Sequence, residues 1–281
     1  MTIELIGEEP LTKDGLSPGY LDLDGRQIYR VLHVPQKIAG AVLVCGPTCA
    51  ERERAHHALN QWCRTLSNMG LAALRFDYAG TGESSGEFSA ANFSRWIEDA
   101  EGCLAWLHQR IGGVPILLHG VRAGALIAAE LFSRALGDGL LLWATPKSAE
   151  ALLWDTMRRT LAAQMVNDPH VPRQTREGLL ASMEAGQSVN VDGYSWTRQF
   201  WDDAKSHVFK RPADPEMRPW LNVAVKRGGG ISPISPLHEQ SVGADALWEQ
   251  SPFILPRVDQ LFSASLDWIR AQADTLMGRD R

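Results

Sequence analysis

The stretch that decides the fold of this chain reads Val114-Pro115-Ile116-Leu117-Leu118-His119-Gly120-Val121-Arg122-Ala123-Gly124-Ala125-Leu126-Ile127-Ala128-Ala129-Glu130. Its first part is a short apolar run typical of a buried strand, and its last part is rich in the small residues of a closely packed helix. Between them, Gly120 and Gly124 allow a tight turn and a close approach of backbones. We therefore expect a strand, a tight turn and a helix in succession, with Arg122 at the tip of the turn.

The same glycine spacing forms the G-x-S-x-G elbow, in which a strained turn holds a nucleophilic serine above a sheet. In this chain Arg122 occupies the position of that serine. A guanidinium stays protonated at any biological pH and has no nucleophilic form. The stretch thus predicts a fold without predicting serine chemistry.

Buried strands and helices alternate along most of the chain. The turn Asp24-Gly25 divides two segments of alternating apolar and polar residues at 20–31, which predicts an antiparallel hairpin. Apolar runs predict strands at 41–45, 71–76, 114–118, 140–143, 220–225 and 251–255, and helices are expected at about 51–69, 92–110 and 258–277. This order predicts a mostly parallel sheet of about eight strands with right-handed crossovers.

The pattern becomes mostly helical between Pro146 and Pro215, apart from a short extended piece at 188–191. We expect one domain, residues 1–281, with residues 146–215 inserted as a helical lid. The lid contains Trp154, Trp196 and Trp201, which are interpreted as core residues. A lid over a cleft would also suit an apolar acyl ligand.

Composition excludes several classes of partner. The net charge of -5 and pI of about 5.9, with no basic run, disfavour nucleic acid and anionic membranes. No apolar stretch is long enough to span a membrane, and the N-terminus is acidic, unlike a secretory signal. The spacing of Cys45, Cys49, Cys63 and Cys103 fits neither a metal site nor a disulfide framework. We expect a cytoplasmic protein with reduced thiols, no cofactor and no metal, and we leave a homodimer open.

Four ordered motifs resemble the α/β-hydrolase superfamily. The turn Arg75-Phe76-Asp77-Tyr78-Ala79-Gly80-Thr81-Gly82-Glu83-Ser84 is similar to the D-x-x-G-x-G-x-S turn of its serine hydrolases. The chain also resembles a subgroup of this superfamily that includes hydrolase-like proteins found with exosortase systems. The motifs that carry this resemblance are the same turn, Gly46-Pro47-Thr48-Cys49-Ala50-Glu51, the elbow at 120–124 and Leu142-Trp143. The resemblance covers about residues 40–268 and implies an α/β-hydrolase fold. One departure is Ala144-Thr145-Pro146, where such relatives tend to place a polar or acidic residue before the proline.

A hydrolytic triad in this fold needs a serine, an acid and a histidine in that chain order. The loop after Val225 reads Lys226-Arg227-Gly228-Gly229-Gly230-Ile231-Ser232-Pro233 and contains no carboxylate. The segment 252–257 contains no histidine, and the last histidine of the chain is His238, in a Pro-rich loop that could reach the cleft. We therefore expect no serine triad.

Arg122 has two interpretations. It could form a buried salt bridge with Glu51, which starts a helix at the same carboxyl edge of the predicted sheet. It could also clamp a ligand's carboxylate or phosphate, because a guanidinium at a helix N-terminus offers bidentate donors and the helix dipole. A buried unpaired arginine is too costly to expect, so one of the two must hold. A glutamate that releases Arg122 to a substrate would satisfy both.

Four further residues complete the predicted site. His119 precedes the elbow and could act as a general acid or base, or could simply bond to neighbouring backbone. Cys49, just before a helix N-terminus, is the alternative nucleophile. Val121 and Trp143 are expected to contact the substrate together with Arg122, Glu51 and Cys49.

Two functions follow from these expectations. The first is an enzyme of the hydrolase or acyltransferase class that acts on an acyl or thioester substrate without a serine triad. The second is a non-catalytic pseudoenzyme that binds a carboxylated small molecule or a partner protein through Arg122. An open cleft with an exposed Arg122 would favour ligand chemistry, and a cleft filled by a Glu51 pair would favour a structural role.

Overall fold

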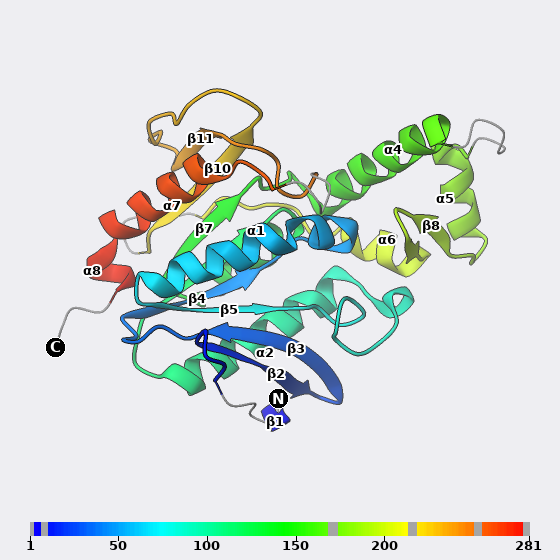
Figure 1. The fold of residues 1–281 in the computed structure, drawn as a ribbon. Helices are drawn as coiled ribbons and strands as arrows, with labels where there is room; N and C mark the ends of the chain where they lie inside the picture. The colour runs from blue at the N-terminus through cyan, green and yellow to red at the C-terminus, as the bar shows by residue number, and fades with distance from the viewer. Residues whose placement is uncertain (1–2, 7–10, 168–173, 213–217, 250–254, 278–281) are drawn as a thin grey trace.

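The computed structural model describes residues 3–6, 11–167, 174–212, 218–249 and 255–277. In these residues nine strands form one sheet in the order β1-β2-β3-β5-β4-β6-β7-β10-β11 (Figure 1). They are β1 (Ile3–Ile6), β2 (Leu16–Leu23), β3 (Arg26–His33), β4 (Gly40–Cys45), β5 (Leu71–Phe76), β6 (Ile116–Val121), β7 (Gly139–Trp143), β10 (Trp220–Lys226) and β11 (Glu239–Gly243). Strands β4, β5, β6, β7, β10 and β11 run parallel, whereas β1, β2 and β3 pair antiparallel with their neighbours. The predicted mostly parallel sheet with an antiparallel opening is confirmed.

The hairpin of β2 and β3 turns at the predicted Asp-Gly pair. Asp24 and Gly25 have φ values of 54° and 82°, and a two-residue turn with positive φ at both positions matches the right-handed twist of the flanking strands. The pairing runs in register from Leu23 opposite Arg26 to Leu16 opposite His33.

Helices cover both faces of the sheet (Figure 1). One face packs against α1 (Cys49–Asn68), α7 (Asp259–Ala271) and α8 (Ala273–Leu276), and the other against α2 (Phe93–Ile111) and α3 (Ala123–Ser133). Along β6, Leu117 and Val121 belong to the apolar cluster with α1 and α7, whereas Ile116 and Leu118 belong to the cluster with α2 and α3. This alternation is the period of a strand, with both faces buried.

The chain between β7 and β10 forms an insertion that starts at the carboxyl ends of the parallel strands. It contains α4 (Ala149–Asn167), α5 (Arg176–Glu184), the hairpin of β8 (Val189–Val191) and β9 (Tyr194–Trp196), and α6 (Arg198–Ala204). Figure 1 shows α4 and α5 extending away from the sheet. Trp196 and Trp201 are 0% and 3% exposed and pack in the core, as expected. The sequence predicted β8 but not its partner β9.

The last strand of the described sheet is β11, which the sequence analysis did not predict. Its residues Glu239-Gln240-Ser241-Val242-Gly243 are mostly polar. Among the described residues β11 pairs with β10 alone, so it lies at the edge of the sheet. Its other side is covered by a loop, in which Ser232 N–H donates to the Ser241 carbonyl. The strand expected at 251–255 falls largely on residues 250–254, which lie outside the described residues.

Candidate functional site

The elbow is built as the sequence predicts. β6 ends at Val121, α3 begins at Ala123, and Arg122 between them has φ 56° and ψ -117°. A positive φ is uncommon for a residue with a side chain, and it persists only where the surroundings fix it. Here the Arg122 N–H donates to the Trp143 carbonyl at 3.1 Å, and the Ala125 N–H donates to the Arg122 carbonyl at 2.9 Å.

Two glycines make this turn possible through close backbone approach. A Cβ on Gly124 would lie 2.0 Å from the carbonyl oxygen of Cys45, and one on Gly120 would lie 2.5 Å from the Cα of Ala125. These separations leave no room for a side chain. The glycines therefore press α3 against the end of β4, which directs the Arg122 side chain to the carboxyl edge of the sheet.

The expected ion pair between Arg122 and Glu51 is present. Arg122 Nε donates to Glu51 Oε2 at 3.1 Å, and Arg122 Nη2 donates to Glu51 Oε1 at 3.0 Å. The Arg122 side chain is 14% exposed and that of Glu51 is 6% exposed. The pair is therefore bidentate, largely removed from water and of the stronger class of hydrogen-bonded ion pairs.

A second arginine, Arg159 of α4, binds the same carboxylate. Its Nη2 donates to Glu51 Oε1 at 2.7 Å, and its Nη1 lies 3.6 Å from Asp155 and 3.3 Å from Glu249. Asp155 also lies 4.0 Å from Arg122. Burial opposes the charge of Arg159, but its hydrogen bond to Glu51 and the nearby carboxylates raise its pKa. We call these five residues, Glu51, Arg122, Asp155, Arg159 and Glu249, the elbow cluster.

The sequence reasoning missed Arg159, Asp155 and Glu249. Arg159 and Asp155 lie one helical turn apart on α4, which shows only that they share a face of that helix. Their approach to Glu51 depends on how the insertion folds back onto the sheet, for which no local signal exists.

The loop after β11 contributes a tryptophan to the elbow. Trp248 is 4% exposed, and the Cζ atom of Arg122 lies 5.4 Å from its ring centroid, within range of a cation–π contact. In this fold the loop after the last strand is where a triad histidine is expected. Here the described residues of that loop, 244–249 and 255–258, read Ala-Asp-Ala-Leu-Trp-Glu and Leu-Pro-Arg-Val.

His119 lies in the core on the α1 and α7 side of the sheet. It is 0% exposed, and its ring centroid lies 5.9 Å from that of Trp62 and 4.4 Å from that of Trp143. Its Nδ1 lies 3.0 Å from the Leu141 carbonyl oxygen, and burial lowers the pKa of His119 to about 4. The geometry favours the structural interpretation of His119, with a neutral ring bonded to backbone, over that of a general acid or base.

Val121, Trp143 and Cys49 also lie inside the protein. Val121 and Trp143 are 0% exposed, and Trp143 Nε1 donates to Ser265 Oγ at 2.9 Å. Cys49 is 6% exposed, and burial raises the pKa of its thiol well above the usual value. Desolvation therefore outweighs the helix N-terminus that was expected to stabilise a thiolate. The geometry gives these three residues packing roles.

The space next to Cys49 and Glu51 is nearly filled. The hollow between Thr48, Cys49, Glu51, Thr156 and Trp196 has a volume of about 10 Å³, which is no more than a single water requires. Among the described residues, the space beside Glu51 thus leaves no room for a ligand.

Two other expected groups lie away from the elbow. His238 precedes β11 at its amino end and lies against Trp220, with ring centroids 5.3 Å apart. It is therefore at the opposite edge of the sheet and does not reach the cleft.

Asp77 accepts two hydrogen bonds of 2.8 Å from Arg52, and Ser84 Oγ donates to the Asp77 carbonyl. The turn that contains Asp77 and Ser84 is therefore held by structural contacts, as expected.

Comparison with known proteins identifies the family. The family described as serine aminopeptidase, S33, matches residues 36–183. Because this match covers more than half of the chain, the protein belongs to this family of the α/β-hydrolase superfamily. No curated protein matches the chain in sequence.

Solved structures share the fold at low sequence identity. α/β-Hydrolase domain-containing protein 10 from mouse has a TM-score of 0.57 and 14% identity over 91% of this chain and 99% of its own. Est1E from Butyrivibrio proteoclasticus has a TM-score of 0.57 and 15% identity, over 92% and 99%. A soluble variant of monoglyceride lipase from Saccharomyces cerevisiae has a TM-score of 0.55 and 12% identity, over 97% and 98%. At these identities the likeness establishes the α/β-hydrolase fold alone.

The part of the chain that the structure describes contains neither a membrane-spanning helix nor a cluster of metal ligands. None of its helices combines the length and apolar character needed to cross a bilayer. The same residues contain no group of three or more histidine, cysteine or acidic side chains arranged to hold a metal ion. All four cysteines lie in this part and are unpaired.

Proposed function

We propose that this protein binds a carboxylated small molecule at the elbow cluster and does not hydrolyse it through a serine triad. The observation that carries the proposal is the convergence of Arg122 and Arg159, from two separate elements, on one carboxylate. Two guanidinium groups around a single carboxylate form a recognition geometry for that group. In the closed form, Glu51 occupies the position that we assign to the ligand's carboxylate.

Arg159 supports a lid role for residues 146–215. It belongs to α4 and binds Glu51 from the insertion side, so an outward shift of α4 would remove one of the two arginines. Arg159 is also the more exposed of the two, at 31% against 14% for Arg122. We infer that a ligand carboxylate meets Arg159 first and then competes with Glu51 for Arg122.

The absence of triad chemistry is supported residue by residue. Arg122 replaces the nucleophile, and His119 is buried in the core with its Nδ1 on a backbone carbonyl. The four ordered motifs further support placing the chain among the hydrolase-like proteins found with exosortase systems, which is part of this proposal. Action on an acyl thioester whose acyl chain carries a second carboxylate is the enzymatic variant of the same proposal.

The test combines a ligand screen with a serine probe. Succinate and butyrate should raise the melting temperature, and methyl butyrate should not, because only the acids carry the recognised charge. At a hundred times its dissociation constant, a bound acid stabilises the fold by about 2.7 kcal/mol. Arg159→Gln should abolish the shift, whereas Arg134→Gln, a surface arginine paired with Glu101, should retain it.

Fluorophosphonate probes, which label activated serines, should leave the protein unlabelled. Stoichiometric labelling of a serine near the elbow would show serine chemistry and overturn the proposal. Equal stabilisation by acids and esters, or acid binding that survives Arg159→Gln, would remove the elbow cluster as the binding site.

A second candidate is a non-catalytic scaffold that binds a partner protein and keeps the elbow permanently closed. The nearly filled hollow at Cys49 and Glu51 favours it. This candidate predicts that no small carboxylate stabilises the protein, while Glu51 remains essential for folding.

A further inference from the structure

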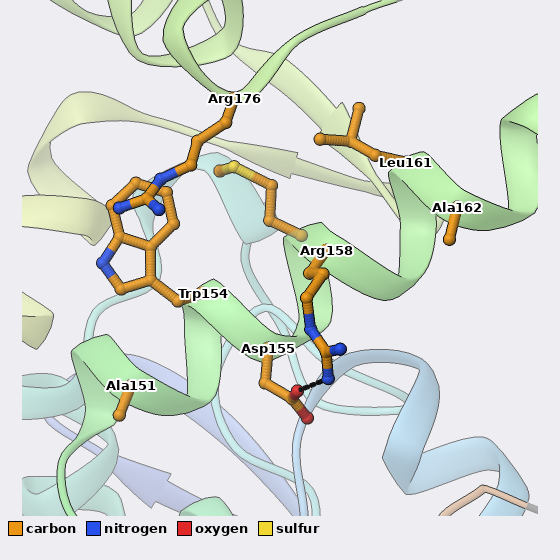
Figure 2. Close-up of a pocket in the computed structure, with 8 residues that line it drawn as sticks. Ala151, Trp154, Asp155, Arg158, Leu161, Ala162 and Arg176 are labelled. Carbon is orange, nitrogen blue, oxygen red and sulfur yellow. Dashed lines mark hydrogen bonds and ion pairs between the residues drawn. The ribbon is translucent and has the colours of Figure 1, made fainter.

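A second hollow lies on the outer face of α4. It has a volume of about 670 Å³, and its apolar lining includes Trp154, Met157 and Leu161. Figure 2 shows Trp154 and Leu161 projecting from α4. Arg158 of α4 and Arg176 at the start of α5 complete it. Its volume is within the range of small-molecule sites, about 300–1,000 Å³.

This pocket faces away from the space under the insertion. Ala151, Trp154, Arg158 and Leu161 recur at intervals of three or four and therefore share one face of α4. Leu152 and Thr156, on the opposite face, are buried and line the small hollow beside Glu51. The outer pocket is thus distinct from the small hollow beside Glu51, although Asp155 both lines the outer pocket and belongs to the elbow cluster.

Trp154 is a fixed platform within the pocket. Its ring packs edge-on against Trp201 of α6, with centroids 4.5 Å apart and planes at 77°, and Trp201 is 3% exposed. On its other side, the Arg176 guanidinium stacks with Cζ 3.3 Å from the Trp154 ring centroid (Figure 2). An arginine stacked on a braced tryptophan is pre-organised for an anion, because its rotamer freedom is already restricted.

Among the described lining residues, the pocket carries one more arginine than carboxylate, with Arg158 and Arg176 against Asp155. Arg158 is paired with Asp155, Nη2 to Oδ1 at 2.6 Å. Burial opposes the charge of Asp155, but Arg158, Arg159 and Arg122 together lower its pKa below the usual value and keep it ionised. Arg176 has no carboxylate partner among the residues that the structure describes. The charge balance therefore favours an anion at Arg176.

We propose that the outer pocket of α4 binds one molecule of an amphipathic carboxylate, such as a medium-chain fatty acid. The carboxylate contacts Arg176, and the hydrocarbon chain lies across Trp154, Met157 and Leu161. A single molecule fits better than an anionic membrane surface, because the site is concave between two helices and the protein carries a net charge of -5. This site goes beyond the proposed function, since it uses none of the contacts to Glu51.

Isothermal titration calorimetry with hexanoate, octanoate and decanoate, each below its micelle concentration, tests the proposal. We expect saturable 1:1 binding whose affinity rises by up to about fourfold for each added methylene, as burial of a hydrocarbon chain predicts. Decanol should bind at least about tenfold more weakly than decanoate, because it lacks the charge that Arg176 recognises.

Variants locate the site. Arg176→Gln and Trp154→Ala should each weaken decanoate binding about tenfold or more. Trp154→Phe should restore part of the affinity lost in Trp154→Ala. The control for Arg176→Gln is Arg270→Gln on α7, an exposed arginine that does not line the pocket. Arg176 is exposed, so an unchanged melting temperature should confirm that its variant is folded.

Four outcomes would overturn the proposal. The first two are that decanoate shows no saturable binding and that decanol binds as tightly as decanoate. The third is that decanoate binding survives both Arg176→Gln and Trp154→Ala. The fourth is that the protein is recruited to lipid vesicles but does not bind monomeric decanoate. Binding that is lost in Arg159→Gln but kept in Arg176→Gln would also place the ligand at the elbow cluster instead. Conversely, decanoate binding through Arg176 would stand even if the elbow cluster bound no carboxylate.

Discussion

Substituting Glu51 with glutamine tests the contact on which the elbow cluster depends. The change keeps the size of the side chain but removes the negative charge that two arginines share. Arg122 binds Glu51 through two hydrogen bonds of 3.0 and 3.1 Å, and Arg159 through one of 2.7 Å. After the substitution two guanidinium groups would face each other without the carboxylate between them. Asp155 would remain 4.0 Å from Arg122, and Asp155 and Glu249 would remain 3.6 and 3.3 Å from Arg159.

We expect Glu51→Gln to lower the free energy of unfolding by about 3–5 kcal/mol, as when one partner of a buried ion pair is removed. The measurement is urea unfolding followed by circular dichroism and tryptophan fluorescence, with an unchanged slope showing that only stability has changed. The matched control is Glu101→Gln, whose pair with Arg134 is about half exposed. It should cost no more than about 1 kcal/mol, as surface ion pairs do.

A double variant separates the pair from other effects of the substitution. Because Glu51→Gln leaves Arg122 unpaired, its cost should fall by about 0.5–3 kcal/mol in an Arg122→Met background. If Glu51→Gln costs no more than Glu101→Gln, the pair is effectively solvated and the closed-cluster interpretation is refuted. Equal costs with and without Arg122 would assign the effect to Arg159 alone.

Three further predictions concern the same region. Arg122→Ser should not create an esterase, because His119 is buried and His238 lies at the other edge of the sheet, and p-nitrophenyl butyrate turnover above that of Arg122→Ala would contradict this. Burial lowers the pKa values of His33 and His119 to about 4, so the unfolded state takes up protons first as the pH falls below 6.5. Stability should therefore fall from pH 6.5 towards 4 by up to about 1.4 kcal/mol per pH unit for each histidine, and histidine signals in NMR that all titrate near 6.5 would disprove it. Gly124→Ala should destabilise the protein by about 1–3 kcal/mol or more in urea unfolding, because the new Cβ would overlap the Cys45 carbonyl; a neutral effect would mean that α3 can move away from β4.

Much of the architecture was predictable because it depends on local patterns. Apolar runs identified β4, β5, β7 and β10, and the Asp24-Gly25 turn identified the opening hairpin. Strand β11 was missed because this edge strand of the described sheet lacks the apolar run of a central strand. Strand β9, the partner of β8, was also missed, because it has three residues and only Trp196 among them is buried.

The sequence by itself determined the elbow, since two glycines at this spacing leave one possible turn and place Arg122 at its tip. It also predicted Glu51 as the partner of Arg122, because both residues follow parallel strands and such strands end at one edge of the sheet. It could not decide that His119 and Trp143 point into the core, because the face that a strand residue occupies depends on what packs against the sheet. Only the tertiary structure brought Arg159 to Glu51 and stacked Arg176 on Trp154. Each contact joins residues on separate helices. The packing of the insertion sets these distances, and no local sequence pattern encodes that packing.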